Sequence, residues 1–270
     1  MPPSAVRAAT LALATLCGAV LSASCGLGFL EGGPPGIAVH ETTVRLHDHE
    51  LTVHLVAGLT HPEGPLLVYA TGDAGWWGGD KALFDHLAPL GYPVAGFSAR
   101  DYTHHLNQPH DRETPRQLAD DYLAIIRASR AGLGLPATTR VVLVGKSRGS
   151  GLAVAAGENP RVRVHLRGVL AVALTGEEEY IEHREPDLPP GTLVMLNTYD
   201  VLPRLGSVPV AVIQSTRDQY LPADAARERF GPDTPVRQFH AIDAANHNFG
   251  GKVAELYEEI DHCLEWILSL

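Results

Sequence analysis

The sequence has little cysteine, no excess of positive charge and no long apolar run. Only 3 of its 270 residues are cysteine, and the formal net charge is −10 at pH 7. An acidic chain argues against a general nucleic-acid surface, because it would be repelled by the phosphate backbone. Hydrophobic residues nevertheless make up 45% of the sequence, which is enough to bury the core of one globular domain.

The apolar run near the N-terminus is too short to cross a bilayer. Arg7 precedes the small and apolar residues 8–20, a pattern typical of a signal peptide rather than of an anchor helix. Small residues before Cys25 resemble a bacterial lipobox. We expect residues 1–24 to be a signal peptide, Cys25 to be acylated and residues 25–40 to be a flexible tether. The protein would then be lipid-anchored in the periplasm or cell envelope. The alternative is plain cleavage with a soluble, secreted product.

Cysteine usage agrees with export and excludes a disulfide. Cys17 would leave with the signal peptide and Cys25 would carry the lipid, so Cys263 would remain alone in a late helix. An intramolecular disulfide is then impossible, and the core must stabilise the fold. We interpret Cys263 as a small buried hydrophobic residue rather than as a reactive thiol.

Strand-like and helix-like segments alternate along residues 41–270, which we expect to form one domain. Residues 42–47 and 51–55 predict an antiparallel edge hairpin. Further strands are predicted at 65–70, 92–97, 141–144, 164–174, 208–213 and 236–240, and helices at 80–90, 115–129, 151–156, 223–229 and 252–268. This alternation predicts an α/β fold with a mainly parallel central sheet and helices on both faces.

Two segments of this domain have less regular patterns. Residues 177–206 are interrupted by proline and predict a small cap or insertion over the sheet. His47 and His49 form a His-x-His pair in the predicted hairpin. We interpret the pair as a polar face, because no third metal ligand is evident nearby. No metal and no cofactor is predicted.

The most informative stretch surrounds Ser147. Residues 141–144 are apolar and mostly β-branched, and Gly145-Lys146-Ser147-Arg148-Gly149 leads from them into a segment rich in alanine and glycine. Gly-x-Ser-x-Gly between a buried strand and a helix is typical of a nucleophile elbow, in which the serine lies on a strained turn. A phosphate-binding P-loop is excluded, because Arg140 stands where that motif needs glycine.

The chain also carries partners for a nucleophilic serine in the order that an α/β-hydrolase requires. Asp218 follows one late predicted strand and His247 follows the last one. Ser147 would attack a carbonyl carbon, His247 would transfer the proton, and Asp218 would orient the imidazole. One of residues 177–179, or Asp200, remains an alternative for the acid. The sequence therefore predicts Ser147, Asp218 and His247 as catalytic residues.

An oxyanion hole needs two backbone N–H donors. One is expected from Arg148, which follows the nucleophile directly, and the other from Asp73, in the turn after the first parallel strand. We predict that these two N–H groups stabilise the tetrahedral intermediate.

Four stretches of this sequence resemble the VirJ/AcvB family of bacterial virulence proteins. They are Thr71-Gly72-Asp73-Ala74-Gly75-Trp76, the segment 114–121, the serine elbow and His247-Asn248-Phe249. The resemblance implies an α/β-hydrolase exported to the periplasm that cleaves the aminoacyl ester of lysyl-phosphatidylglycerol. The sequence departs from the family at the elbow, where Lys146 and Arg148 replace an aromatic and an apolar residue.

The resemblance also suggests how such a lipid ester would be bound. Ammonium groups of the acyl part would meet carboxylates such as Asp101, a lipid phosphate would face Lys146 or Arg148, and Trp76 would form an apolar rim. We therefore predict Trp76, Lys146 and Asp101 as substrate-binding residues, in a pocket formed by residues 99–113 and 177–206. The alternative is a non-enzymatic envelope protein that keeps the fold and binds secretion-system components.

Overall fold

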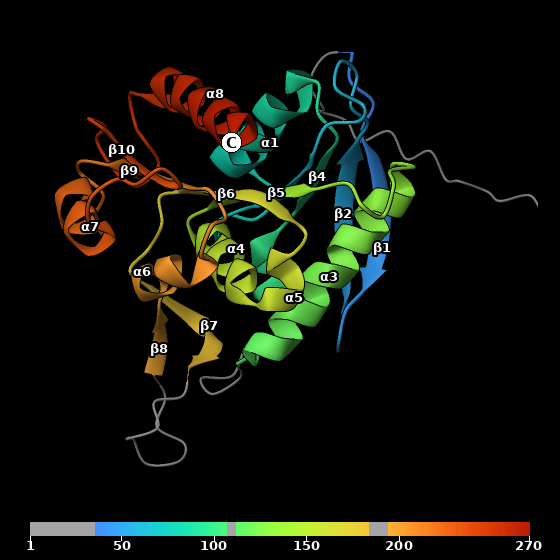
Figure 1. Cartoon of the computed structure of the whole chain (residues 1–270), viewed down its shortest axis with the longest axis horizontal. Coiled ribbons are helices and arrows are strands. Elements are labelled where there is room, and N and C mark those ends of the chain that lie inside the picture. The colour runs from blue at the N-terminus through green and yellow to red at the C-terminus, as the bar shows by residue number, and fades with distance from the viewer. Residues whose placement is uncertain (1–35, 107–111, 184–193) are drawn as a thin grey trace, which may run out of the picture.

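An eight-stranded sheet forms the centre of the molecule in the computed structural model, which describes residues 36–106, 112–183 and 194–270 (Figure 1). The strand order is β1-β2-β4-β3-β5-β6-β9-β10. β2 is antiparallel to both β1 and β4, and the other neighbours are parallel. The strands are β1 His40–Arg45, β2 Glu50–Val56, β3 Leu66–Ala70, β4 Val94–Phe97, β5 Val141–Lys146, β6 Leu166–Val172, β9 Val210–Ser215 and β10 Arg237–Ile242.

Helices cover both faces of this sheet, which confirms the predicted fold class. α1 and α8 lie on one side, and α3 and α4 lie on the other (Figure 1). Each side has its own cluster of buried apolar residues. The helical elements are α1 Gly78–Leu87, η1 Ala88–Leu90, α2 Ala99–Thr103, α3 Pro115–Gly132, α4 Arg148–Glu158, α5 Pro160–Arg163, α6 Thr198–Val201, η2 Leu202–Leu205, α7 Ala223–Phe230 and α8 Val253–Ser269.

Local sequence explains where the main elements begin. The central strand β5 consists largely of β-branched residues that are buried on both faces, as a strand covered by helices requires. α3 begins with a capping box, in which the Thr114 hydroxyl accepts the N–H of Gln117 and the Gln117 side chain accepts the N–H of Thr114. Pro115 occupies the first turn, where its missing N–H costs nothing.

The segment 177–206 contains regular structure that the sequence did not predict. β7 Glu177–His183 and β8 Val194–Asn197 form a separate antiparallel sheet, and α6 and η2 follow it. A bridge between Glu113 and Ile181 joins this sheet to the start of α3. β7 was missed because it begins with three glutamates instead of alternating apolar residues.

Some of the predictions fall on residues that the structure does not describe. The signal peptide 1–24, Cys25 and most of the tether 25–40 lie outside the described residues. Cys263, which does lie within them, is fully buried. Among the helices of the three described ranges, none is both long and apolar enough to cross a membrane.

Candidate active site

Ser147 lies on a sharp turn between β5 and α4, as the elbow motif predicts. Its backbone has φ 53° and ψ −121°, a conformation that residues with side chains rarely adopt. The two flanking glycines are required by close packing. A Cβ on Gly145 would lie 2.2 Å from the carbonyl oxygen of Gly149, and one on Gly149 would lie 2.2 Å from that of Ala70. The strain therefore lifts Ser147 above the end of the strand.

Three side chains from separate parts of the chain form a continuous hydrogen-bonded row. The hydroxyl oxygen of Ser147 lies 2.8 Å from Nε2 of His247, and Nδ1 of His247 lies 2.6 Å from Oδ2 of Asp218. His247 and Asp218 are buried, whereas Ser147 is half-buried. The structure thus brings the three predicted residues together in the geometry of a nucleophile, a base and an acid that orients the base.

Local hydrogen bonds hold the carboxylate of Asp218 in place. Its Oδ1 accepts the backbone N–H groups of Tyr220, at 2.8 Å, and Leu221, at 3.3 Å. Its Oδ2 accepts the side-chain amide of Gln214 at 3.1 Å. Asp218 follows β9 and His247 follows β10, and these parallel strands end at the same edge of the sheet. Asp218, rather than the alternative acids, is therefore the carboxylate that contacts His247.

The predicted oxyanion donors lie in the two turns beside the serine. The N–H groups of Asp73 and Arg148 donate no hydrogen bond to any acceptor in the described ranges, so both are available to a ligand. The N–H of Gly72 is not available, because it donates to Oδ2 of the buried Asp80 at 3.0 Å. The arrangement leaves two donors beside the hydroxyl of Ser147, and their role in catalysis stays a prediction.

A cavity of about 400 Å³ opens at Ser147. Its wall comes mainly from the connection between β6 and β7, the start of β7 and the loop after Asp218. The lining residues are Asp73, Ser147, Arg148, Thr175, Gly176, Glu177, Glu178, Glu179, Met195, Tyr220, Leu221 and Arg229. The segment 177–206 thus contributes as predicted, whereas no described residue of 99–113 lines the cavity. Tyr220, Leu221 and Arg229 were missed, although the first two lie only two and three residues after Asp218.

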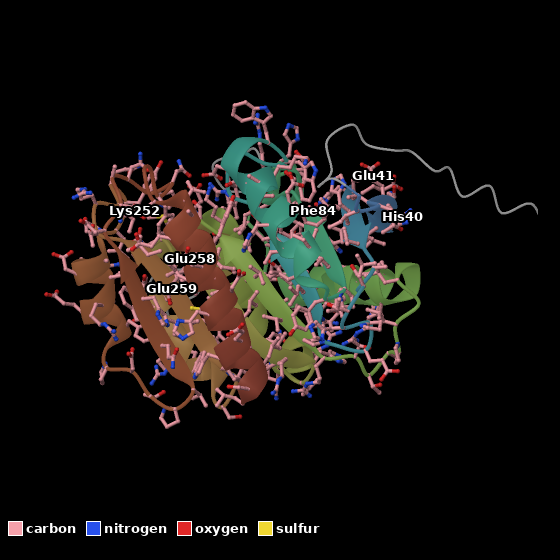
Figure 2. The ribbon with its side chains drawn as sticks, turned by 90° about the horizontal axis from the view of Figure 1, so that it is seen from above. His40, Glu41, Phe84, Lys252, Glu258 and Glu259 are labelled. Atoms are coloured by element: carbon pink, nitrogen blue, oxygen red, sulfur yellow. The ribbon has the colours of Figure 1, made fainter. Side chains whose placement is uncertain are left out.

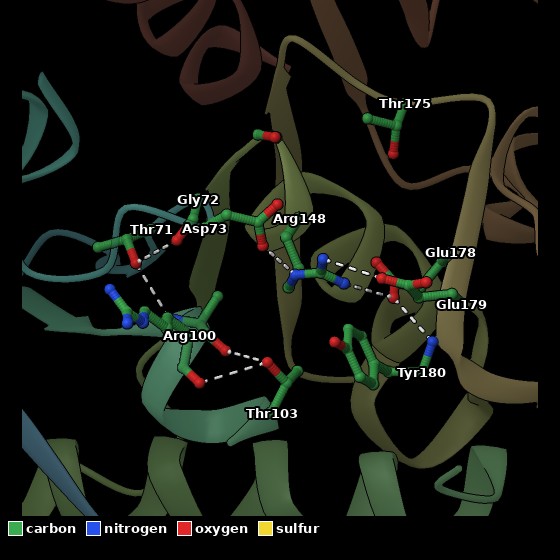
Figure 3. A network of polar contacts seen from close by, with 12 residues as sticks. Thr71, Gly72, Asp73, Arg100, Thr103, Arg148, Thr175, Glu178, Glu179 and Tyr180 are labelled. Carbon is green, nitrogen blue, oxygen red and sulfur yellow. Dashed lines mark hydrogen bonds and ion pairs between the residues drawn. The ribbon is translucent and has the colours of Figure 1, made fainter. Parts of the chain in front are cut away.

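Arg148 is held in place by carboxylates on both sides, as Figure 3 shows. Its Nε donates to Oδ1 of Asp73, its Nη2 lies 3.1 Å from Glu179, and its Nη1 lies 3.5 Å from Glu178. The guanidinium also stacks over the ring of Tyr180, 4.3 Å from its centroid. Although burial alone would lower the pKa of Arg148, its bond to Asp73 and the negative charges around it raise that pKa. The positive charge of the Arg148 guanidinium is thus balanced by carboxylates of the protein itself.

Glu178 is the most deeply buried carboxyl group of this wall. Burial raises its pKa to about 7, against the positive charge of Arg148, which lowers it. Glu178 also accepts the backbone N–H of Tyr180 at 3.0 Å (Figure 3). Because Glu178 titrates near neutrality, the net charge of the cavity at Ser147 changes with pH in this range.

The three predicted substrate-binding residues lie elsewhere. Lys146 is buried and forms an ion pair with Asp80, so its expected contact with a lipid phosphate is wrong. Trp76 stacks on His54 with ring centroids 3.8 Å apart, and it packs against the core instead of forming a rim. Asp101 is exposed on α2 and does not line the cavity. The residue types and sequence positions of Lys146, Trp76 and Asp101 did not reveal which groups these side chains contact in the fold.

Two groups of side chains in the described part of the chain could hold a metal ion. Asp48, His49 and His105 have ligand atoms within 4.8 Å of one another, and so do His240, Glu259 and Cys263. The first group was missed because its third member is distant in sequence from the His-x-His pair. None of these residues lines the cavity at Ser147.

The parallel sheet, the strained serine turn and the placement of Asp218 and His247 define an α/β-hydrolase fold. Residues 65–182 match the family described as "Bacterial virulence protein (VirJ)", which confirms, over that segment, the resemblance seen in the sequence. The match includes the turn at Asp73 and the elbow, and it ends before Asp218. A search of curated proteins found no match.

Solved structures show the same fold at low sequence identity. Est1E from Butyrivibrio proteoclasticus is similar with a TM-score of 0.58 and 15% identity, over 84% of this chain and 98% of Est1E. A putative dienelactone hydrolase from Klebsiella pneumoniae subsp. pneumoniae MGH 78578 has a TM-score of 0.57 and 15% identity, over 86% and 98% of the two chains. The acylaminoacyl peptidase of Pyrococcus horikoshii has a TM-score of 0.64 and 14% identity, over 86% of this chain and 42% of the peptidase.

Proposed function

We propose that this protein is a serine hydrolase that cleaves a carboxylic ester. The observation that carries the proposal is the row formed by Ser147, His247 and Asp218, with separations of 2.8 and 2.6 Å. A protein that only binds partners has no physical need for a strained serine aligned with a buried imidazole and carboxylate. The distance between His247 and Ser147 therefore favours the enzyme over the envelope-binding alternative.

The reaction follows from the placement of these groups. His247 accepts the proton of Ser147 as the hydroxyl oxygen attacks the ester carbon, and Asp218 stabilises the imidazolium that forms. The N–H groups of Asp73 and Arg148 receive the negative charge on the carbonyl oxygen. His247 then gives its proton to the leaving alcohol, and a water molecule activated by the same imidazole releases the acid and restores Ser147.

The proposed substrate is an aminoacyl ester of a phospholipid head group, with lysyl-phosphatidylglycerol as the specific candidate. Four carboxyl groups, from Asp73 and residues 177–179, line the cavity together with only two guanidinium groups. This excess of acid suits an acyl group that carries ammonium groups. Arg229 has no carboxylate partner among the described residues, so it replaces Lys146 as the candidate for the lipid phosphate.

Labelling with a fluorophosphonate probe tests the enzyme class. We expect the purified protein to be labelled once, at Ser147, and the label to vanish in Ser147→Ala. Ser150→Ala is a matched control, because the Ser150 hydroxyl is buried and donates to the carbonyl oxygen of Ser147. A folded wild-type protein that takes up no probe, or equal labelling of Ser147→Ala, contradicts the proposal.

A second assay tests the substrate separately. Purified protein is incubated with lysyl-phosphatidylglycerol in detergent micelles and, in parallel, with a short-chain nitrophenyl ester. We expect release of lysine from the lipid and loss of that release in Ser147→Ala. Hydrolysis of the short-chain ester alone would leave the enzyme class standing and reject the lipid.

Export and lipid anchoring complete the proposal. Acylated Cys25 would hold the domain at the membrane surface in the cell envelope, where such a lipid is accessible. Metabolic labelling with a fatty acid is expected to mark the wild-type protein and not Cys25→Ser. Release of an unlabelled wild-type protein into the soluble fraction would reject the anchor and support plain cleavage.

A further inference from the structure

A second cluster of reactive side chains lies at the junction of β10 and α8, away from the cavity at Ser147. His240 comes from β10, and Glu259 and Cys263 lie one turn apart on α8. Oε1 of Glu259 lies 2.7 Å from Nδ1 of His240 and 3.9 Å from the sulfur of Cys263. All three ligand atoms lie within 4.8 Å of one another. The geometry points to a zinc site formed by His240, Glu259 and Cys263.

The donor set suits zinc better than a hard cation. Zinc takes thiolate, imidazole and carboxylate ligands at roughly 2.0–2.3 Å in a tetrahedron, which corresponds to ligand atoms roughly 3.3–3.6 Å apart. The separations of 2.7 and 3.9 Å around Glu259 lie on either side of that range, so small side-chain movements suffice. Magnesium and calcium prefer sites composed only of oxygen ligands, which a thiol and an imidazole do not provide.

The hydrogen bond on the far side of His240 prepares its ring for a metal. Nε2 of His240 lies 3.2 Å from the side-chain oxygen Oε1 of Gln238, and the tautomer with an N–H at Nε2 donates there. In that tautomer the lone pair at Nδ1 points toward the carboxylate oxygen of Glu259, 2.7 Å away. A cation bound between these two atoms would take the place of the proton that otherwise joins them. An outer hydrogen bond that fixes the tautomer is the usual support of a histidine ligand.

Burial of the sulfur supplies a second, independent observation. Cys263 is fully buried, and in the described part of the chain its only polar contact is the long one to Glu259. His262 precedes it on α8, with Nδ1 at 3.5 Å from the same Glu259 oxygen and an exposed ring. The fourth position therefore faces solvent, where His262 or water can occupy it. An ion can enter from this side.

Binding is a proton exchange without any redox step. Zn²⁺ replaces the proton of the Cys263 thiol, the proton passes to solvent, and the thiolate becomes a ligand. The ion would add a metal link between the edge strand β10 and α8, which already meet through the contact of His240 with Glu259 and through side-chain packing. Because His247 lies in the loop after β10, the link would stabilise the base of that loop. The inference does not depend on the proposed esterase activity.

Cobalt substitution tests the site in the full chain without a histidine tag. Co²⁺ bound by a thiolate gives a charge-transfer absorption that nitrogen and oxygen ligands do not give. We expect the metal-free, reduced protein to develop this band at one equivalent of Co²⁺ and to lose it when Zn²⁺ is added. Cys263→Ser should abolish the band, and the double variant Cys17→Ser/Cys25→Ser should keep it.

Two neighbouring glutamates provide a matched pair of variants, both marked on α8 in Figure 2. Glu259→Gln removes a proposed ligand, whereas Glu258→Gln removes the same charge from an exposed neighbour. We expect the affinity for Zn²⁺, measured by competition with a chromogenic chelator, to fall at least about tenfold in Glu259→Gln and His240→Gln. Glu258→Gln should bind like the wild type. Circular dichroism verifies that each variant is folded.

Three results would overturn the zinc site. They are no charge-transfer band in the wild type, an undiminished band in Cys263→Ser, or equal affinities of Glu259→Gln and Glu258→Gln. Equal affinities would assign the bound ion to surface histidines. If Cys263→Ser does not fold, the comparison of the two glutamate variants decides the question by itself.

Discussion

The ammonium nitrogen of Lys146 lies 2.5 Å from Oδ1 of Asp80, and both side chains are buried. The second oxygen of Asp80 accepts the N–H of Gly72 at 3.0 Å. Lys146 immediately precedes Ser147, and Gly72 immediately precedes Asp73. The buried pair therefore connects the serine turn to the turn that carries the second predicted oxyanion donor. On the outer side, the ion pair of Arg148 with Asp73 makes a parallel connection.

Removing one partner of the buried pair should be strongly destabilising. Asp80→Ala leaves the ammonium group of Lys146 without a counter-charge and the N–H of Gly72 without an acceptor. We expect the free energy of unfolding to fall by about 3–5 kcal/mol, measured by urea denaturation. Glu50→Ala, which removes the carboxylate of an exposed pair with Arg45, should cost much less.

A double variant separates the charge from the packing. Lys146→Met in the Asp80→Ala background removes the unpaired buried charge, so the double variant should be more stable than Asp80→Ala alone. Equal stability of the two proteins would show that Lys146 is not desolvated by its surroundings.

The outer ion pair should affect turnover more than substrate binding. Asp73→Ala removes the ion pair that joins the turn of Asp73 to Arg148, so the two predicted oxyanion donors are held less firmly relative to each other. We expect kcat for a short-chain ester to fall about 10²-fold with a smaller change in KM. Asp73→Asn keeps an oxygen that accepts from Arg148, and it should recover most of the loss. Glu179→Gln changes another partner of the same guanidinium, and an equal loss there would argue against this role.

The fold and the row of Ser147, Asp218 and His247 could be predicted because they depend on local patterns. Buried strands are visible as β-branched runs, and the carboxyl ends of parallel strands meet at one edge, so residues just after them come together. The partners of Lys146 and Trp76 depend on long-range packing. Asp80 and His54 are remote in sequence, and no local pattern identifies them as the groups that bury these side chains.

The wall of the cavity shows the same limit. Glu177, Glu178 and Glu179 looked like a loop after a strand, because strands are recognised by apolar alternation. They are instead the first residues of β7, which β8 and Arg148 hold in place. The start of β7 lacks an apolar face, and the ion pairs of Glu178 and Glu179 with Arg148 hold it in place instead.

Replacing Asp218 should impair catalysis while leaving the fold intact. Asp218→Asn keeps the shape of the side chain but no longer stabilises the imidazolium of His247 and favours the wrong tautomer. We expect kcat to fall about 10⁴-fold, in a pre-steady-state or endpoint assay with a short-chain ester. Asp243→Asn alters an exposed carboxylate that bonds to Thr216 and Arg217 in a neighbouring loop, and it should retain activity. A similar loss in both variants would remove Asp218 from the proposed mechanism.

The buried Glu113 should make the stability of the protein depend on pH. Burial raises its pKa from 4.5 to about 8, and the negative charge of Asp121 adds to this, whereas the hydrogen bond from Tyr102 opposes it. Between these two pKa values the folded protein holds a proton that the unfolded chain releases, so raising the pH favours unfolding. The contribution of Glu113 to stability is complete below the unfolded pKa and is lost as the pH rises through about 8.

Glu113→Gln isolates this contribution, because glutamine resembles the protonated acid and does not titrate. The free energy of unfolding of the wild type should fall more steeply than that of Glu113→Gln between about pH 5 and about pH 8, by at most about 1.4 kcal/mol per pH unit. Urea denaturation at several pH values measures both slopes. Glu63→Gln, at an exposed position, should follow the wild type. Parallel slopes for the wild type and Glu113→Gln would mean that Glu113 is already ionised in the folded protein.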